Sequence, residues 1–417
     1  MRQTSLLLLV ITLLPFSCDT EQNVPPVFET YFTKYYGEDG NQVGVDLLVN
    51  NDGSMILLGN SSSQTNPVTI PFIVKIDPEG LVLWQRELGE LNEEAVDVEV
   101  DGNNNLIIVS NVGTEDNSRI RIFRLNQDGR GLDSVLINSS VKQVARSVTP
   151  VSDGSFLISG YAGPTFVADN ELTNDQADLL IYRVDENLDP DSLEPLVKQG
   201  GEHVGKIVKV FQSKQAGPIK YLACGDSDRP FDEGENYRES FEVILRNKFG
   251  DPDGLRAGGT GDESQYQRAS TAIETPGFMQ ERYLMVGSSF TQNNSSNIFI
   301  AQYSIEDENL SVRFSTSIPL GGRMEGISAA PIAPDGYLIL ANEFRDNAKR
   351  DIILVKVADD GNLIGSTSFG SVEGDDSAGA VRVLADGRVA VFGTIELETQ
   401  RKMVLIVLSP DGKFSNG

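Results

Sequence analysis

The chain has very few of the residues on which many catalytic and metal sites depend. Its 417 residues include one histidine, His203, and two cysteines, Cys18 and Cys224. A zinc site built from several histidines is therefore excluded, as is a relay of paired histidines. A Ser-His-Asp triad would have to use His203, which we expect to be an exposed polar residue. The sequence predicts no catalytic residue and no cofactor.

Positive charge is also scarce. Lys and Arg total 34 against 61 Asp and Glu, so the formal net charge is −27. Such a surface repels duplex nucleic acid and anionic lipid, which excludes nucleic acid as a partner. The acidity either keeps the surface solvated or suits cations, basic partner groups and neutral glycans.

Long apolar runs are absent except near the start, where LLLLVITLL is too short to span a bilayer. One Arg precedes this run and PFSC follows it. The segment resembles the signal peptide of a bacterial lipoprotein, whose terminal Cys takes a diacylglyceryl group. The resemblance implies a signal peptide over 1–17, a lipidated Cys18 and a polar tether over 18–27. Acidic residues directly after Cys18 resemble those of lipoproteins that the Bacteroidota export, which implies the outer membrane, with the cell surface favoured over the periplasmic face.

One phrase recurs along the rest of the chain. It reads NDGSMILLGN from Asn51, SDGSFLISGY from Ser152 and ADGRVAVFGT from Ala385. A turn with Asp-Gly is followed each time by an apolar run and a small residue. These small residues recur every 50 to 65 positions, a spacing typical of four-stranded propeller blades: Gly59, Ser110, Gly160, Gly225, Gly287, Ala341 and Gly393.

Each repeat predicts four strands. A strand such as VDLLV precedes the Asp-Gly turn, the apolar run follows it, and an alternating segment such as FIVKID and a closing segment such as LVLWQRELG complete the unit. Because β-branched residues abound and no helical period appears, we expect an all-β fold. The words ADGRVAVFG, SPDGK and TSFGS resemble delta-60 propeller repeats and, less closely, quinoprotein-like repeats, a resemblance that implies blade geometry and no function.

The two ends of the chain predict how the ring closes. The last repeat stops after its third strand, whereas VFETYFTKYYG, from Val27, has the pattern of a fourth strand alone. We therefore predict a seven-bladed β-propeller over residues 28–417, with the N-terminal strand beside Val404 to Leu408. Cys224 lies in an apolar strand of this domain and is expected to be a buried, inert thiol.

The long, variable loops of such a propeller lie at the end opposite the short turns, and we expect function there. The links between blades are acidic. They either face water or line a pocket for a cation or a basic group at the channel mouth. The candidate binding residues are Asp39, Glu94, Glu202, Asp262, Glu325 and Asp375 in the links, with Phe231 and Tyr237 in a long loop.

A second acidic stretch resembles the start of a calcium loop. Asp185, Asn187, Asp189 and Asp191 stand at alternate positions, as oxygen ligands do in such loops. Pro190 replaces the glycine of the sharp turn, and Leu196 replaces the bidentate Glu. An acidic hairpin is therefore the preferred interpretation and Ca²⁺ the alternative.

Three classes of function remain. The favoured interpretation is a non-catalytic binding platform for a protein complex at the outer membrane. The second is a glycan-binding module that serves nutrient uptake, with exposed aromatic side chains as stacking surfaces. The third is a polysaccharide hydrolase or lyase, for which many carboxylates are available and none is singled out.

Overall fold

The computed structural model describes residues 31–413. The gaps in this range are 64–67, 115–116, 138, 140–141, 164–177, 190–193, 198–204, 215–220, 228–239, 247–254, 258–265, 276–280, 291–294, 307–308, 333–335 and 346–348. Cys18, the predicted signal peptide and the predicted tether lie outside the described residues. No helix long and apolar enough to cross a membrane occurs within the described ranges.

The described strands form seven four-stranded antiparallel sheets, which we call blades. Blade 1 contains β2 (Asn41–Val49), β3 (Met55–Ser62), β4 (Ile70–Ile76) and β5 (Val82–Glu87). Blade 2 contains β6 (Glu93–Val100), β7 (Leu106–Val112), β8 (Arg119–Leu125) and β9 (Gly131–Ile137). Blade 3 contains β10 (Gln143–Pro150), β11 (Phe156–Ala162), β12 (Asp178–Val184) and β13 (Glu194–Val197).

The second half of the chain repeats this order. Blade 4 contains β14 (Gly205–Gln212), β15 (Tyr221–Ser227), β16 (Ser240–Arg246) and β17 (Leu255–Ala257). Blade 5 contains β18 (Tyr266–Glu274), β19 (Glu281–Phe290), β20 (Ser296–Glu306) and β21 (Asn309–Ile318). Blade 6 contains β22 (Arg323–Pro331), β23 (Tyr337–Phe344), β24 (Arg350–Val357) and β25 (Leu363–Phe369). The terminal blade contains β1 (Phe32–Tyr36), β26 (Ser377–Val383), β27 (Val389–Leu397) and β28 (Gln400–Leu408).

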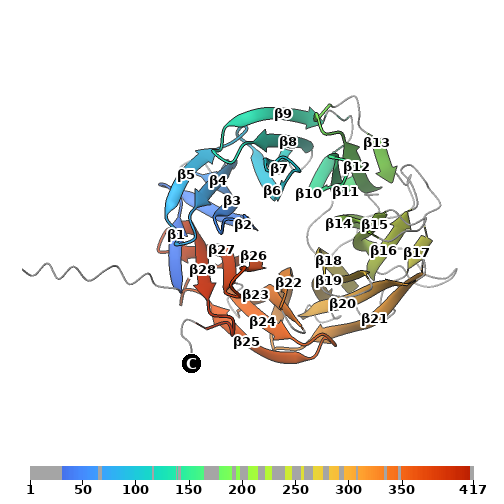
Figure 1. The fold of residues 1–417 in the computed structure, drawn as a ribbon. Coiled ribbons are helices and arrows are strands. Elements are labelled where there is room, and N and C mark those ends of the chain that lie inside the picture. The colour runs from blue at the N-terminus through green and yellow to red at the C-terminus, as the bar shows by residue number, and fades with distance from the viewer. Residues whose placement is uncertain are drawn as a thin grey trace, which may run out of the picture.

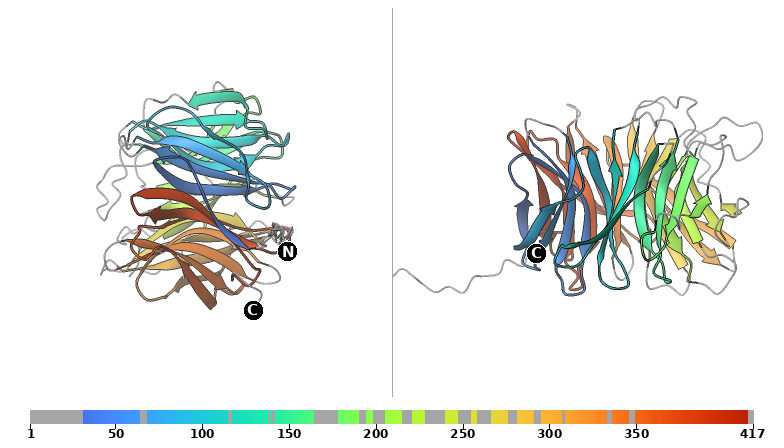
Figure 2. Two further views of the ribbon diagram at one scale, coloured as in Figure 1. Left: turned by 90° about the vertical axis from the view of Figure 1, so that its left-hand side faces the viewer. Right: turned by 90° about the horizontal axis from the view of Figure 1, so that it is seen from above.

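The blades stand around a central axis (Figure 1), and their strands run through the thickness of the disc (Figure 2). The first strand of each blade lies nearest the axis and the fourth at the periphery. The prediction of an all-β propeller built from four-stranded blades is confirmed. We call the end that carries the turns between strands one and two and between strands three and four the turn end, and the opposite end the loop end.

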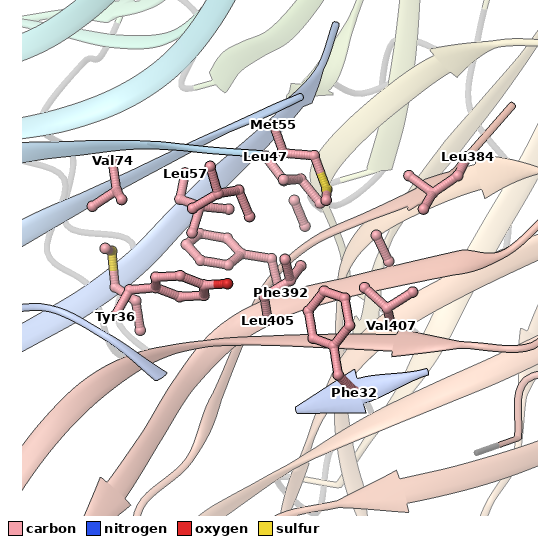
Figure 3. Packing of buried hydrophobic residues seen from close by; sticks show 14 of the residues in the cluster. Phe32, Tyr36, Leu47, Met55, Leu57, Val74, Leu384, Phe392, Leu405 and Val407 are labelled. Atoms are coloured by element: carbon pink, nitrogen blue, oxygen red, sulfur yellow. The ribbon is translucent and has the colours of Figure 1, made fainter. Parts of the chain in front are cut away.

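The N-terminal strand belongs to the same sheet as the end of the chain. β1 pairs with β28 antiparallel, with Phe32 opposite Val407 and Tyr36 opposite Met403. Figure 3 shows Phe32 and Tyr36 in an apolar cluster with Leu47 of blade 1 and Phe392 of the terminal blade. Both aromatic side chains are buried. The N-terminal strand therefore lies beside β28, as the sequence predicted.

The recurring Asp-Gly turns have a local cause. Gly53 adopts φ = 81° and Gly154 adopts φ = 85°, a left-handed conformation that glycine tolerates without a steric cost. The preceding carboxylate closes the turn, since Asp52 Oδ1 accepts hydrogen bonds from the Ser54 amide (2.9 Å) and hydroxyl (2.6 Å). Asp153 makes the same two contacts with Ser155.

The periodic small residues lie opposite a β-bulge. Every innermost strand has a register shift at the same place, for example between Gly44 and Asp46, and the small residue of the second strand pairs with the residue just before it. A side chain at Gly160 would collide with the Val144 carbonyl, and one at Gly225 with the Lys206 carbonyl. The second-strand residue is therefore small because the bulge brings backbone against it.

The next residue along the second strand joins neighbouring blades. Asn60 Oδ1 accepts from the Ala95 amide at 2.7 Å, and Asn111 Oδ1 accepts from the Ala145 amide at 2.8 Å. Thr394 of the terminal blade holds the Gly44 amide of blade 1 in the same way, at 2.9 Å. An apolar cluster also fills each interface between neighbouring blades, including the interface of the terminal blade with blade 1.

Candidate functional site

The bulges set the floor of a central cavity. In each innermost strand the extra residue of the bulge is directed at the cavity, and these residues form a collar around the axis: Val45, Val96, Arg146, Val208, Ser270, Ile327 and Gly379. The residue after the bulge is polar in six of the seven strands, and these six also line the cavity: Asp46, Asp97, Ser147, Lys209, Thr271 and Ser328.

The cavity has a volume of about 930 Å³ and lies on the turn side of this collar. Its described lining begins at the bulge in every innermost strand and continues to Thr275, Gly336 and Asp359, which belong to turns at the turn end. Such a volume can hold several sugar rings or a ligand of similar size. The sequence predicted function at the loop end, whereas this cavity extends toward the turn end.

An ion-pair cluster occupies the wall formed by blades 2 to 4. Lys209 Nζ of β14 donates to Asp97 Oδ2 and Glu99 Oε1 of β6, both at 3.1 Å, and to the Val148 carbonyl at 2.9 Å. Burial lowers the pKa of Lys209, but the two carboxylates outweigh it, so the pKa lies above its usual value. Lys209 is therefore charged at neutral pH and holds Asp97 in place.

Asp46 of β2 lies beside this cluster. Its Oδ1 accepts from Arg382 Nη2 at 2.7 Å, its Oδ2 accepts from the Val98 amide at 3.3 Å, and its carboxyl shares a hydrogen bond with Asp97. Only 8% of Asp46 is exposed. Two carboxyls in contact in a poorly solvated site cannot both ionise without a large repulsion, so one of them retains a proton.

The surroundings decide which carboxyl holds that proton. Burial raises the pKa of Asp46 to about 7, because the charge of Arg382 only partly offsets the lost solvation and the charge of Asp97 raises it further. Burial also acts on Asp97, but Lys209 and the amide of Val148 outweigh it, and the pKa of Asp97 lies below its usual value. At neutral pH Asp97 is ionised, and Asp46 occurs in both its protonated and its ionised form.

The opposite wall carries a second polar group. Tyr337 donates its hydroxyl to Asp359 Oδ1 at 3.0 Å, and Arg282 Nη1 lies 3.4 Å from Asp359 Oδ2. Gln302 donates to both Tyr337 and Asp359. Burial and the neighbouring carboxylate raise the pKa of Tyr337, which therefore keeps its proton. These contacts fix the wall where blades 5 and 6 meet.

The residues that the sequence proposed for binding do not gather at this cavity. Asp39 and Glu94 are exposed at the loop end, and Glu325 accepts from Asn342 Nδ2 at 3.3 Å. Asp375 pairs with Arg350 at 2.8 Å and with Arg401 at 2.9 Å, contacts that lower its pKa. None of the four is part of the described lining. The other candidates, Glu202, Asp262, Phe231 and Tyr237, lie outside the described residues, as does His203.

The candidate calcium loop is a turn between β12 and β13. Asp185 Oδ1 accepts from the amides of Asn187 (3.1 Å) and Asp189 (2.9 Å), so this oxygen closes the turn. Asp191 lies outside the described residues. In the part of the chain that the structure describes, no three His, Cys, Asp or Glu side chains are grouped as metal ligands would be. Cys224 is fully buried, and burial raises the pKa of its thiol.

The cavity residues were missed because each looks ordinary in its own repeat. A signal was nevertheless present: VDLLV and VDVEV both place an Asp inside an apolar inner strand, at the same position of the repeat. A charged residue in a strand that faces the axis needs a partner there. Arg382 could not be paired with Asp46 from the sequence, because 336 residues separate them.

Comparisons with known proteins concern the fold. No protein-family model and no curated protein match the sequence. The structure of an ulvan lyase of polysaccharide lyase family PL25, bound to -[GlcA(1-4)Rha3S]-, matches with a TM-score of 0.54 and 10% identity, over 93% of this chain and 97% of that chain. The polysaccharide lyase Uly1 matches with a TM-score of 0.52 and 8% identity, over 90% of this chain and 92% of that chain. Identities this low show a shared fold alone.

These comparisons contradict the function favoured from the sequence. That interpretation was a non-catalytic binding platform for a protein complex. Solved propellers that share the fold over at least 90% of the chain are instead described as polysaccharide lyases. The physical reason for the error is that the repeats encode blade geometry, while the cavity's carboxyls and cations come from different repeats and meet only in the folded ring.

Proposed function

We propose that this chain is a polysaccharide-processing enzyme that binds its substrate in the central cavity, with Asp46 as the group that transfers the proton. The observation that carries the proposal is the contact of the Asp46 carboxyl with Asp97 at the cavity wall, with Arg382 on its other side. The solved propellers of similar fold support a glycan as the substrate class.

Asp46 suits proton transfer at neutral pH. A general acid or base works best when its pKa lies near the working pH, and burial raises the pKa of Asp46 to about 7. Asp97 is held ionised by Lys209 and stays a fixed neighbour. Two carboxyls whose environments push their pKa values apart are the usual sign of an acid–base pair.

The closeness of the pair favours elimination over hydrolysis. Hydrolases separate their two carboxyls by roughly 5 Å or more, so that a sugar or a water fits between them. Asp46 and Asp97 share a hydrogen bond, which leaves no such space. In an elimination, ionised Asp46 takes a proton from a sugar carbon, the bond to the glycosidic oxygen breaks as a carbon–carbon double bond forms, and the same proton then passes to that oxygen.

The test is turnover by purified protein on a panel of neutral and acidic polysaccharides. We expect shorter chains that carry a double bond, with product masses that sum to the mass of the substrate. Asp46→Asn should lower kcat/KM by about 10²-fold or more. Asn removes the proton carrier but should not prevent folding, because burial already disfavours the charged form of Asp46.

The matched control is Glu94→Gln, which makes the same chemical change at an exposed carboxylate outside the cavity. Its kcat/KM should equal that of the wild type. Products whose summed mass exceeds that of the substrate by one water for each bond broken would show that the reaction is hydrolysis rather than elimination. Full activity of Asp46→Asn, or no turnover of any member of the panel, would contradict the proposal.

We further propose that the blades form one closed seven-bladed ring, that Cys18 carries a lipid and that the body stands at the outer membrane. The pairing of β1 with β28 and the Thr394 contact with Gly44 support the closed ring. The apolar run before Cys18 and the polar stretch after it support the anchor. Calcium remains a proposal only for the turn that begins at Asp185.

A further inference from the structure

Arg146 is the extra residue of the bulge in β10 and belongs to the collar of the cavity. It is exposed, whereas the residues on either side of it, Ala145 and Ser147, are buried. Within the described part of the chain it forms no ion pair. Because a bulge re-aims the side chain that it inserts, this arginine is directed at the space that a ligand would fill.

The other two cations of the described lining are already occupied. Lys209 is held by Asp97 and Glu99, and Arg382 is held by Asp46. The positive charge of Lys209 is therefore largely neutralised inside the protein, and the Arg382 guanidinium is engaged by its hydrogen bond to Asp46. Arg146 alone of these three brings a guanidinium to the cavity without a carboxylate partner.

The Arg146 guanidinium lies over an aromatic side chain. Its guanidinium carbon lies 5.6 Å from the centre of the Tyr161 ring, and Tyr161 is buried at 6% exposure. A guanidinium over an aromatic face leaves the N–H groups at its edge free. Those N–H groups match two oxygens of a carboxylate or sulfate in a paired, bidentate contact.

We propose that Arg146 binds an acidic group of the glycan, a carboxylate or a sulfate ester, so that the substrate class is an anionic polysaccharide. The inference that the ligand is a glycan rests on the proposed function. The binding contact itself can be tested without turnover. A carboxylate on the sugar that loses its proton would also suit elimination, since the negative charge that forms on the sugar carbon spreads onto that carboxylate, where the bound guanidinium stabilises it.

The charge of the whole molecule makes this contact selective. With a net charge of −27 the surface repels polyanions, so nonspecific binding of an acidic polymer is disfavoured. Attraction must then come from a local cation. Binding of an acidic glycan by so acidic a protein would be a specific event rather than a property of its surface.

The experiment compares three polymers with one backbone: dextran, carboxymethyl-dextran and dextran sulfate. Binding to the full chain is measured by titration calorimetry at a fixed, moderate salt concentration. We expect at least one acidic polymer to bind at least 10-fold more tightly than dextran, and the two acidic polymers distinguish carboxylate from sulfate. Arg146→Gln should weaken that binding roughly 10-fold to 100-fold, the range for hydrogen bonds to a charged group.

Two further variants identify the cause. Arg146→Lys keeps the charge but loses the two-pronged donor geometry, so it should restore only part of the affinity. Arg130→Gln makes the same change in net charge at an exposed arginine outside the described lining and should leave binding unchanged. Equal affinity for all three polymers, or equal losses in Arg146→Gln and Arg130→Gln, would overturn the inference. Turnover of a neutral polysaccharide with no effect of Arg146→Gln would overturn it while the proposed function stands.

Discussion

At the scale of single residues, the chemistry proposed for the central cavity depends on the burial of Asp46. Its carboxyl receives one hydrogen bond from Arg382 and one from the Val98 amide. Burial outweighs the charge of Arg382 and, together with the charge of Asp97, raises the pKa of Asp46 to about 7. Asp97 is one repeat further along and differs because Lys209 lies against it. The same residue type at the same position of two repeats thus takes two protonation states.

The pH dependence of activity should follow this difference. If ionised Asp46 is the base, kcat/KM should fall as the pH drops through about 7, because the proton that Asp46 gains blocks the transfer. Asp97→Asn removes a like charge that raises this pKa, so the acid limb of the profile should move to lower pH. Arg382→Gln removes a charge that lowers it, so the limb should move to higher pH.

The measurement is kcat/KM from pH 5 to pH 9 for the three proteins, with circular dichroism as a check that each is folded. Shifts of opposite sign in the two variants would not arise from general damage to the fold. A profile that is flat through pH 7, or that moves in the same direction in both variants, would show that Asp46 is not the base.

At the scale of strands, the bulge is the element that turns a repeat into a site. Each inner strand contributes one collar residue, six of the seven also contribute the polar residue that follows it, and the same irregularity recurs in every blade. Because the backbone is fixed by the bulge and by the small residue opposite, the side chains at these positions can vary freely. Val, Ile, Ser, Gly and Arg all occur in the collar.

The sequence predicted the strands well because their signals are local. Asp-Gly turns, alternation and the spacing of Gly59, Gly160 and Gly393 each report on a few neighbouring residues. The site was not predicted because it is assembled across the ring. Asp46 contacts Arg382 only when the terminal blade lies beside blade 1. The bulge that exposes Arg146 cannot be predicted from the alternation of apolar and polar residues along the strand.

The strand β1 should contribute strongly to stability. Phe32 and Tyr36 are buried in the cluster between the terminal blade and blade 1, and the Tyr36 hydroxyl donates to the Gly80 carbonyl at 3.0 Å. Deletion of 28–36 removes both aromatic side chains and exposes the edge of β28, at a cost of more than about 4 kcal/mol. The midpoint of chemical denaturation should fall markedly.

The matched control is deletion of 19–25, which removes a similar length of chain that lies outside the described residues. Its denaturation midpoint should equal that of the parent protein. Equal midpoints for the two truncations would contradict the role assigned to β1.

At the scale of the whole molecule, the cavity and the beginning of β1, the first described strand, lie at the same end. β1 runs from the turn end, since Phe32 pairs with Val407, next to the turn that starts at Ser409. The described lining of the cavity also extends to the turn end. An anchor at the N-terminus would therefore approach the body from the side on which the cavity lies.

Anchoring itself can be tested by one substitution. Cys18→Ala removes the thiol that would carry the lipid, and since acyl chains supply most of the membrane affinity of such proteins, the variant should become soluble with an intact body. The measurement is the distribution of the protein between membrane and soluble fractions of native cells. Retention of Cys18→Ala in the membrane would contradict the anchor, and Cys224→Ala serves as the control for loss of a thiol.

The sharing of one sheet by β1 and β28 has a consequence for biosynthesis. β1 must wait for β28 before it finds its hydrogen-bonding partner, because all the other described strands lie between them in the chain. Blades 1 to 6 are each contiguous and can form as the chain emerges, whereas the terminal blade cannot. A prematurely terminated chain therefore keeps an unpaired aromatic strand, a mark by which quality-control proteases could distinguish it from the finished protein.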